Sequence, residues 1–300
     1  CTDVRQNCMT TLWKGGMLRT CLAAIFIAIS QLLPAQTYFR NFSVSDGLSN
    51  NTVKSIAFDM DGFLWVGTED GLNRYDGKTF ETVLDFPEEL LPVYNEYVSA
   101  LLTDSRGTLW VGTSSGLFYK PRHASQFSML EVCDSEGAAF RPDVLSITED
   151  KHGRIWFSTF AHGIICLERE DFSFRVMSKT LEGDEMLYVP QVYADSDGNV
   201  WAAVRRSGSR LMHYDEINGG FTPFGADRPV PDILCICEDS YNNLWLGTWD
   251  RGVLKFNPRT RKLTSVITDL DKVLHVHSLV EYRKNVIAIG SDKGLTLWDE

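Results

Sequence analysis

The sequence predicts an all-β fold, a β-propeller of four-stranded blades, from three observations. A tryptophan recurs at steps of 45, 46, 45 and 44 residues, by subtraction of residue numbers. Each of these tryptophans lies in a phrase like Leu-Trp-Val-Gly-Thr, followed by Gly-Leu, and a strand-like run and a turn precede it. Repeats of about 40–50 residues built from short strands are typical of propeller blades. The recurring residues are Trp65, Trp110, Trp156, Trp201 and Trp245.

Length and composition fit one large globular domain. The chain has 300 residues, 44% of them hydrophobic and 23% charged, which excludes a disordered chain. Its formal charge is −11. It becomes −13 without residues 1–35, because that stretch holds Arg5, Lys14 and Arg19 against Asp3. An acidic body disfavours nucleic acid and anionic membranes as partners.

Residues 1–35 are expected to be a leader and signal peptide. Lys14 and Arg19 precede the apolar run 21–33, and Ala35 offers a cleavage site. This run is shorter than the ~20 residues that cross a bilayer. We therefore expect an exported protein whose propeller covers residues 36–300.

Six copies of the repeat follow in order, each opening with a first strand. In the first five, this strand ends in Asp, and after two intervening residues comes a residue that tolerates positive φ, as a tight turn requires. The copies start near residues 53, 98, 144, 191, 233 and 278, and the turn residues are Gly62, Gly107, Gly153, Gly198 and Asn242.

The aspartates that begin these turns are expected to accept backbone N–H groups and close the hairpins. Asp59 and Asp61 imitate the opening of a calcium loop, but no closing Glu follows, so we expect no metal and no cofactor. The tryptophan after each turn is expected to pack between neighbouring blades. Burying such a ring contributes roughly 4–6 kcal/mol before costs. One tryptophan per blade explains the period without a ligand.

The sixth copy is degenerate, and the closure of the ring stays open. Ala288 stands where the repeat has tryptophan. The segment Tyr38–Val44 resembles the outer strands of the blades and is a candidate to complete the last one. Two alternatives remain: a six-bladed ring, or part of a seven-bladed propeller truncated at the C-terminus of this sequence.

With Gly47-Leu-Ser-Asn-Asn-Thr-Val53 leading into Leu64-Trp-Val-Gly-Thr68 and Tyr75-Asp-Gly77, the chain resembles the two-component regulator propeller repeat family. Those repeats form the periplasmic sensor of hybrid two-component histidine kinases in Bacteroidetes. The resemblance implies detection of oligosaccharides and control of polysaccharide utilisation genes. It also implies a homodimer through the parent sensor, a periplasmic location, and membrane attachment only through a later segment. The chain departs from the pattern at Ala202-Ala-Val204.

In a propeller, the loops after the second strands and the connections between blades share one face. Trp249 in such a loop offers a flat apolar surface to a sugar ring, and arginines from the fourth and fifth copies suit carboxylates or sulfates. The open alternatives are packing of Trp249 on a neighbouring blade and pairing of the arginines with acids. The candidate ligand residues are Trp249, Arg251, Arg205, Arg206, Arg210, His162, Tyr94, Glu96 and Tyr97, together with Arg141, Tyr188 and His275.

Three classes of function fit a propeller: a periplasmic sensor, a secreted carbohydrate- or protein-binding propeller without signalling, and a propeller glycosidase or lyase. An enzyme needs two converging carboxylates or a base with a stabilising cation. No spacing singles out such a pair among the acids of the expected binding face, and none of the common catalytic motifs occurs. We therefore assign no catalytic residue and rank the oligosaccharide sensor first.

Overall fold

The computed structural model describes residues 40–83, 97–134, 136–205, 210–224, 230–269 and 273–299. Within these ranges the regular structure consists of β-strands and one 3₁₀ turn, η1 (Val44–Asp46). The strands belong to one compact unit, Ser43–Glu300. The all-β propeller that the tryptophan period predicts is confirmed.

Six antiparallel sheets, the blades, follow one another along the chain, and within each the strands pair in sequence order. The first three blades are β1 (Val53–Phe58), β2 (Leu64–Thr68), β3 (Gly71–Tyr75) and β4 (Phe80–Thr82); β5 (Val98–Thr103), β6 (Leu109–Thr113), β7 (Gly116–Lys120) and β8 (Ser128–Met129); and β11 (Asp143–Glu149), β12 (Ile155–Phe160), β13 (Ile164–Leu167) and β14 (Phe174–Met177). The others are β15 (Gln191–Ala194), β16 (Val200–Val204), β17 (Arg210–Asp215) and β18 (Gly220–Pro223); β19 (Ile233–Glu238), β20 (Leu244–Thr248), β21 (Val253–Asn257) and β22 (Lys262–Ile267); and β23 (Val276–Arg283), β24 (Val286–Ser291) and β25 (Gly294–Asp299).

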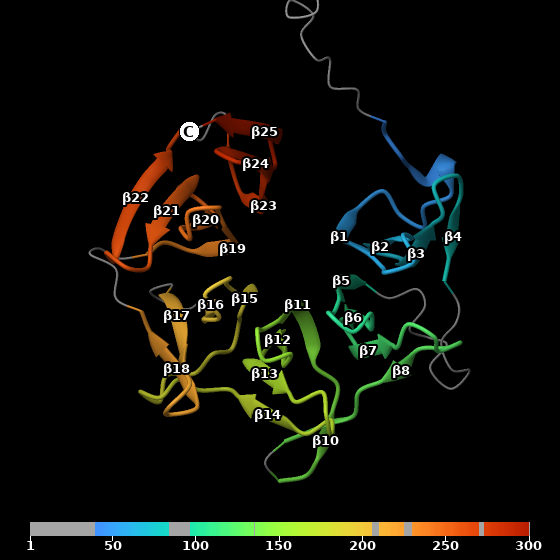
Figure 1. Cartoon of the computed structure of the whole chain (residues 1–300), viewed down its shortest axis with the longest axis horizontal. Helices are drawn as coiled ribbons and strands as arrows, with labels where there is room; N and C mark the ends of the chain where they lie inside the picture. The colour runs from blue at the N-terminus through green and yellow to red at the C-terminus, as the bar shows by residue number, and fades with distance from the viewer. Residues whose placement is uncertain are drawn as a thin grey trace, which may run out of the picture. The chain divides into compact units, whose positions relative to one another are not determined.

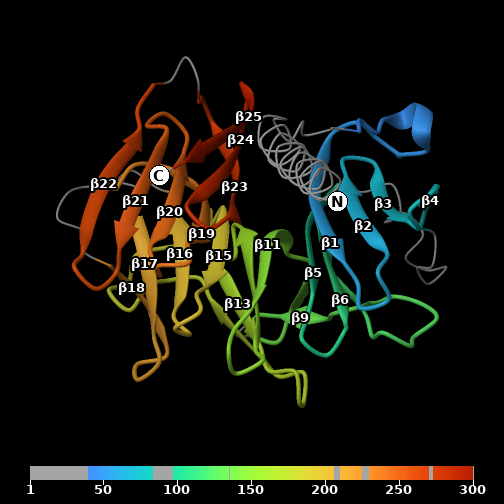
Figure 2. The ribbon, with the colours of Figure 1, turned by 45° about the horizontal axis from the view of Figure 1, so that its top comes forward.

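The blades stand side by side around a central axis, with the first strand of each nearest the centre (Figure 1). Each first strand contacts the next: β1 with β5, β5 with β11, β11 with β15, β15 with β19, and β19 with β23. Figure 2 shows the outer strands β4, β18 and β22 at the periphery. The first strands of all six blades therefore lie together at the centre of the arrangement, which makes them candidates for a binding site.

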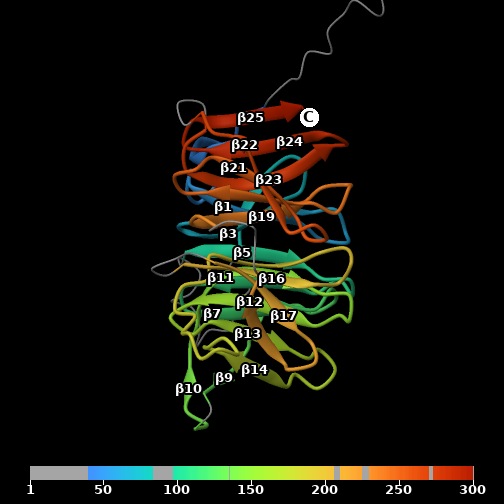
Figure 3. The ribbon, with the colours of Figure 1, turned by 90° about the vertical axis from the view of Figure 1, so that its left-hand side faces the viewer.

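One hairpin lies outside the blades. Strands β9 (Val132–Cys133) and β10 (Ala139–Phe140) form a separate two-stranded sheet in the connection between the second and third blades. Figures 1 and 3 place it at the outer edge of the propeller. The repeat pattern contains no signal for this insertion.

The turn aspartates act as expected and also bind the tryptophan six residues later. Asp59 Oδ1 accepts the backbone N–H groups of Asp61 and Phe63, while its Oδ2 accepts Trp65 Nε1 at 2.7 Å. The same bond recurs in the next four blades at 2.7 to 2.9 Å. The four turn glycines and Asn242 all have positive φ. Because one carboxylate closes the turn and also anchors the indole, the Asp and the Trp of each blade recur together.

These hydrogen bonds make the fold sensitive to acid. Burial by itself would raise the pKa of Asp150 and Asp239, but hydrogen bonds from Trp156 and Arg154 to the first, and from Asn243 and Trp245 to the second, hold each pKa below its ordinary 3.8. A carboxylate with a lowered folded-state pKa adds stability above its ordinary pKa, and this stability is lost as pH falls through the folded value.

We therefore expect the urea midpoint of unfolding to decrease as pH falls below about 4. An Asp239→Asn variant cannot titrate at this position, so its midpoint should change less over the same pH range. Equal pH profiles for the variant and the parent would contradict this assignment of the acid sensitivity.

Each repeated tryptophan packs on the following blade, as the period predicts. Trp110 lies in one cluster with Val144, Ile155 and Phe157 of the third blade, and it is 1% exposed. Four further clusters of the same kind join the remaining neighbouring pairs of blades. The core is therefore a series of apolar layers between blades rather than one central mass.

The glycine of the Val-Gly-Thr phrase is where the next blade approaches most closely. A Cβ built on Gly112 would lie 2.5 Å from Val144 Cγ1, and one on Gly67 would lie 2.6 Å from Val98 Cγ1. A side chain at these positions would push neighbouring first strands apart.

Gly112→Ala is expected to lower the free energy of unfolding by about 1–3 kcal/mol, because added carbon overpacks a close contact. In a double-mutant cycle with Val144→Ala, the combined loss should be smaller than the sum of the single losses, since the shortened valine makes room. Additive losses in chemical denaturation would show that Gly112 has another role.

The N-terminal segment does not form the strand that its sequence suggests, as far as the structure describes it. Arg40–Ser43 carry no strand, and Val44 begins η1. Ser43 and Asp46 form a reciprocal capping box, in which Ser43 N–H donates to Asp46 Oδ2 at 2.9 Å. This cap favours a turn over an extended strand. Residues 38 and 39 lie outside the described residues, and the sixth blade has three strands within them.

Candidate functional site

The first strands place one extra residue each toward the channel. In β1, β5, β19 and β23 the pairing register shifts after the first residue, and in β11 it shifts after the second, which leaves one bulged residue in each strand. In the fourth blade Pro190, which has no N–H to pair, stands at the corresponding place before β15. Bulges re-aim side chains and are common beside binding sites. The six residues are Lys54, Ser99, Leu145, Pro190, Leu234 and His277.

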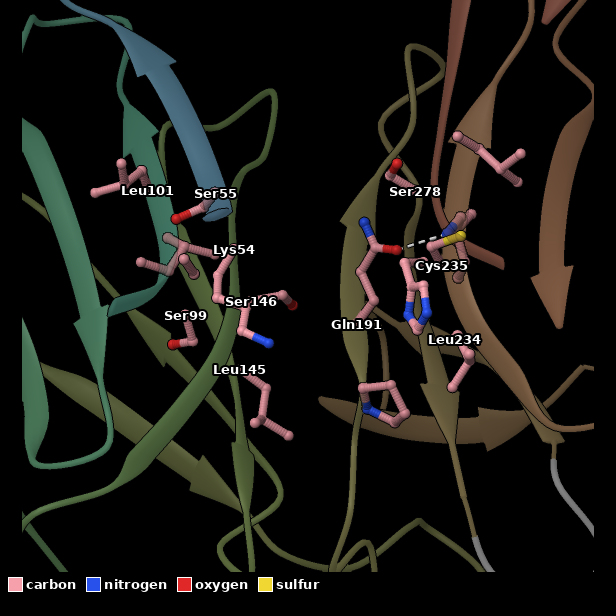
Figure 4. Close-up of a pocket in the computed structure, with 16 residues that line it drawn as sticks. Lys54, Ser55, Ser99, Leu101, Leu145, Ser146, Gln191, Leu234, Cys235 and Ser278 are labelled. Atoms are coloured by element: carbon pink, nitrogen blue, oxygen red, sulfur yellow. Dashed lines mark hydrogen bonds between the residues drawn. The ribbon is translucent and has the colours of Figure 1, made fainter. Parts of the chain in front are cut away.

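These six residues line both of two adjoining pockets. The inner one, of about 270 Å³, lies between the first strands. Figure 4 shows Lys54 and Ser99 on one side of it, and Leu234 and Cys235 on the other. Around the ring, the three apolar residues come from the third to fifth blades and the three polar ones from the sixth, first and second. The channel wall therefore offers hydrogen-bonding groups on one side and an apolar surface on the other.

The outer pocket, of about 590 Å³, opens where aromatic rings surround the channel mouth. Tyr97 and Tyr188 come from connections between blades, whereas Arg205 and Trp249 follow second strands. All four line the pocket, which confirms that these two sets of loops share one face. Its volume lies within the ~300–1,000 Å³ typical of small-molecule sites.

Arg205 is held between two of these rings. Its guanidinium lies 5.4 Å from the centre of the Trp249 ring and 6.0 Å from that of Tyr188, and its Nε donates to Asp232 Oδ2 at 3.1 Å. The backbone is tied as well, since Arg205 N–H donates to the Tyr188 carbonyl and Trp249 N–H to that of Asp232. This packing restricts the orientation of the guanidinium, including its two terminal nitrogens. A guanidinium with a restricted orientation suits an arginine that binds an anion.

Trp249 stacks on His275, with 3.8 Å between ring centres and 24° between planes. His275 has φ 47°, a strained value for a side chain other than glycine. Asp292 accepts a hydrogen bond from His275 Nδ1 and one from His277 Nε2, each at 2.6 Å, and these two bonds lower the pKa of Asp292. An ionised Asp292 therefore holds both imidazoles beside the pocket, and Trp249, 40% exposed, keeps an open face.

Lys54 completes the charged side of the mouth. Its Nζ lies 3.0 Å from Glu69 Oε1 and 5.2 Å from the ring centre of Tyr97. Burial by itself would lower the pKa of Lys54, but Glu69 and Tyr97 raise it above its ordinary value. Lys54 is therefore cationic at neutral pH. The pocket thus carries two cations, Lys54 and Arg205, on a protein that is acidic overall.

The structure divides the residues predicted from the sequence into three groups. Trp249, Arg205 and Tyr97 line the outer pocket. Arg251 points elsewhere, with its side chain 71% exposed near Asp250, and His162 stacks on Phe140 with 4.4 Å between ring centres. Residues Tyr94, Glu96 and Arg206, and the side chain of Arg210, lie outside the described residues.

Sequence reasoning missed Lys54 and His277. Both occupy the bulge of a first strand, directly after a valine that packs on the preceding blade or begins the repeat. The signal that points to them is positional: the residue after the first valine or isoleucine of these strands varies in chemistry from blade to blade, as Lys54, Ser99, Leu145, Leu234 and His277. Alternation within a strand cannot reveal it, because a bulge breaks the two-residue period.

No group of three or more His, Cys, Asp or Glu side chains among the described residues is placed to hold a metal ion. In the same part of the chain, no helix is long and apolar enough to cross a membrane.

The repeats match a known family. The profile of the two-component regulator propeller matches residues 47–70, 95–115, 141–161 and 228–250. Among characterised proteins, the chain is 48% identical over 67 residues to "Histidine kinase P4" of Formosa agariphila. That alignment covers 21% of this chain and 5% of the kinase.

Solved structures share the fold. The extracellular domain of the hybrid two-component system BT3049 from B. thetaiotaomicron superposes with a TM-score of 0.69 and 24% identity, over 87% of this chain and 35% of that one. The extracellular domain of BT4673 from the same organism superposes with a TM-score of 0.67 and 18% identity, over 88% of this chain and 36% of that one. A virginiamycin B lyase from Staphylococcus aureus gives 0.61 and 14%, over 84% and 86%. The chain thus spans about a third of the two extracellular domains, with which it shares the propeller fold, and four of its repeats match the two-component regulator propeller profile.

Proposed function

We propose that this propeller is the ligand-sensing part of a hybrid two-component system and that it binds an oligosaccharide at the channel mouth. The observation that carries the proposal is the outer pocket, where Trp249, Tyr97 and Tyr188 surround two cations. Flat aromatic rings match the apolar faces of sugars, and nearby polar groups select among hydroxyl patterns. The match of four repeats to the two-component regulator propeller profile supports the sensing role.

An anionic oligosaccharide fits this pocket better than a neutral one. Arg205 pairs with Asp232, and Lys54 pairs with Glu69. A guanidinium has five N–H donors, so Arg205 retains donors for a carboxylate or sulfate of the ligand. The apolar residues Leu145 and Leu234 then accommodate the uncharged face of the sugar deeper in the channel.

The site is less suited to glycoside hydrolysis or lyase chemistry. A glycosidase needs a protonated carboxylic acid with a raised pKa facing a second, ionised carboxylate. The pKa of Asp292 is lowered rather than raised, and Asp232 and Glu69 are each paired with a cation. Likeness to the lyase at 14% identity extends to the fold alone. We therefore infer binding without turnover.

We further propose that the domain is exported, acts in the periplasm as part of an inner-membrane protein, and works as a homodimer. Its neighbouring blades share buried apolar layers, so the ligand is expected to shift the position of the rigid disc in the dimer rather than remodel it. This region contacts no nucleic acid, and membrane attachment comes from another segment of the protein. A secreted propeller that binds without signalling is the second candidate.

The binding proposal is tested by calorimetric titration of the purified protein with neutral, uronate-containing and sulfated oligosaccharides. We expect an anionic oligosaccharide to bind, with affinity that decreases as salt increases, and with no cleavage products by chromatography. Absence of binding across the panel, or turnover of any member, would overturn it. Sequencing the gene beyond codon 300 separates the two candidates: a kinase in the same reading frame supports the sensor, and a stop codon supports the secreted propeller.

A further inference from the structure

The third blade repeats an arrangement that the fifth blade contributes to the outer pocket. In the fifth blade, Trp249 directly follows the second strand, Asp232 directly precedes the first strand, and Trp249 N–H donates to the Asp232 carbonyl. In the third blade, Phe160 and Asp143 hold the same places relative to the threonine of the second strand and the β-branched residue of the first, and they pair with each other. The third blade therefore carries an aromatic ring and a carboxylate side by side on the face of the propeller that holds the pocket.

Phe160 continues the row of planar groups beyond the pocket. Its ring lies 5.7 Å from the ring of Tyr188, with 69° between the planes, and the two residues form an isolated β-bridge. Tyr188 lines the outer pocket and contacts Arg205, which in turn contacts Trp249. These groups come from the third, fourth and fifth blades, which are neighbours (Figure 1). The row is therefore continuous, and Phe160, which is 54% exposed, offers an uncovered apolar surface at its end.

Asp143 differs from Asp232 in what the preceding blade presents to it. Asp232 accepts a hydrogen bond from Arg205, which directly follows the second strand of the fourth blade. In the second blade the corresponding residue is Ser114, so no arginine stands at this place. Burial raises the pKa of Asp143, and none of the described residues donates a hydrogen bond to its carboxylate. Asp143 is therefore a hydrogen-bond acceptor that still lacks donors.

We propose that Phe160 and Asp143 form a second sugar subsite, which binds a neutral unit of the oligosaccharide whose anionic unit occupies the outer pocket. The inference rests on the proposed function, because Tyr188 belongs to the pocket and also contacts Phe160. The ring of Phe160 offers a flat apolar surface to one face of the sugar, and the Asp143 carboxylate accepts hydrogen bonds from its hydroxyl groups. The protein then recognises an oligosaccharide of mixed charge rather than a single anionic sugar.

The charges of the two sites explain why the second unit is neutral. The outer pocket presents the cations Arg205 and Lys54, whereas the second subsite is built from a ring and a carboxylate. An anionic unit beside Asp143 would bring two like charges together, which is unfavourable in a binding site. A neutral unit makes contacts that salt does not screen, so the affinity that it adds is independent of salt. Binding at the outer pocket, by contrast, weakens as salt increases.

The experiment compares three probes by calorimetric titration of the purified protein. They are the methyl glycoside of a uronic acid, a mixed disaccharide of a uronate and a neutral hexose in both anomeric forms, and a disaccharide of two uronates. We expect the mixed disaccharide to bind about tenfold more tightly than the glycoside, at low and at high salt. Phe160→Ala should abolish this gain. Asp143→Asn should raise the affinity for the disaccharide of two uronates about fivefold, because it removes the like charge.

Phe172→Ala is the matched control, because Phe172 is an exposed phenylalanine in the turn between β13 and β14, at the opposite end of the same blade. It should keep the gain of the parent protein. The gain is a ratio of two affinities, so any loss of folded protein in a variant cancels. Binding of the glycoside without a gain for the mixed disaccharide, or a gain that survives Phe160→Ala, would overturn the second subsite and leave the outer pocket in place. Absence of binding of all three probes would overturn both.

Discussion

Replacing Trp249 by alanine is expected to weaken binding of the oligosaccharide about 30-fold. Aromatic side chains at the centre of a binding site cost about 2 kcal/mol or more when truncated, and each 1.4 kcal/mol is a factor of ten in affinity. The ring lines the outer pocket and stacks on His275, so its loss removes the sugar platform and leaves Arg205 without its neighbour. Calorimetric titration with the best oligosaccharide of the panel measures the effect.

Arg205→Ala separates charge recognition from stacking. It should strongly reduce the affinity for an anionic oligosaccharide and only slightly reduce the affinity for a neutral analogue. It should also reduce the salt dependence of binding. Tyr241→Ala is the matched control for the aromatic change, since Tyr241 is 50% exposed but belongs to a turn that does not line the pocket. Arg251→Ala is the control for the charge. Equal losses in the pocket and control variants would place the ligand elsewhere.

Replacing Asp104 by alanine is expected to lower the free energy of unfolding by about 3–5 kcal/mol, because it breaks a buried ion pair by removing one partner. Arg169 Nη1 lies 2.6 Å from Asp104 Oδ2, and both side chains are almost fully buried. The carboxylate also accepts Trp110 Nε1 and the Thr108 N–H, each at 2.9 Å. These bonds lower the pKa of Asp104 although burial by itself would raise it.

Urea denaturation followed by tryptophan fluorescence measures this loss. Asp197→Ala is the matched control, because Asp197 is an exposed aspartate of the corresponding turn in the fourth blade, and its change should stay within about 0.5 kcal/mol. Asp104→Asn keeps the shape of the side chain and one hydrogen-bond acceptor. Its loss in the free energy of unfolding should therefore lie between the losses of Asp104→Ala and Asp197→Ala. If Asp104→Ala cost no more than the control, the Asp–Trp bond would be a consequence of the fold and not a source of its stability.

The blades could be predicted from the sequence because their determinants are local. The Asp-x-x-Gly turn closes within five residues, and the tryptophan that it binds is six residues from the aspartate. Strand, turn and strand therefore recur together wherever that short phrase recurs. Ser43–Asp46 form a turn where a strand was expected, and the capping box that favours this turn is also local. In the sequence, the capping box is a weaker signal than the apolar residues of Tyr38–Val44, which suggest a strand.

The repeat pattern also predicted which loops share a face, and it indicated Trp249, Arg205 and Tyr97 as members of a common site. Three-dimensional packing was needed to show that Arg251 and His162 lie elsewhere, and that Lys54 and His277 line the pocket. The reason is physical: side-chain direction in a loop depends on packing against the next blade, and a β-bulge redirects a residue without changing the pattern of its neighbours. That residues about 200 positions apart, such as Lys54 and Trp249, line one pocket has no local signature in the sequence.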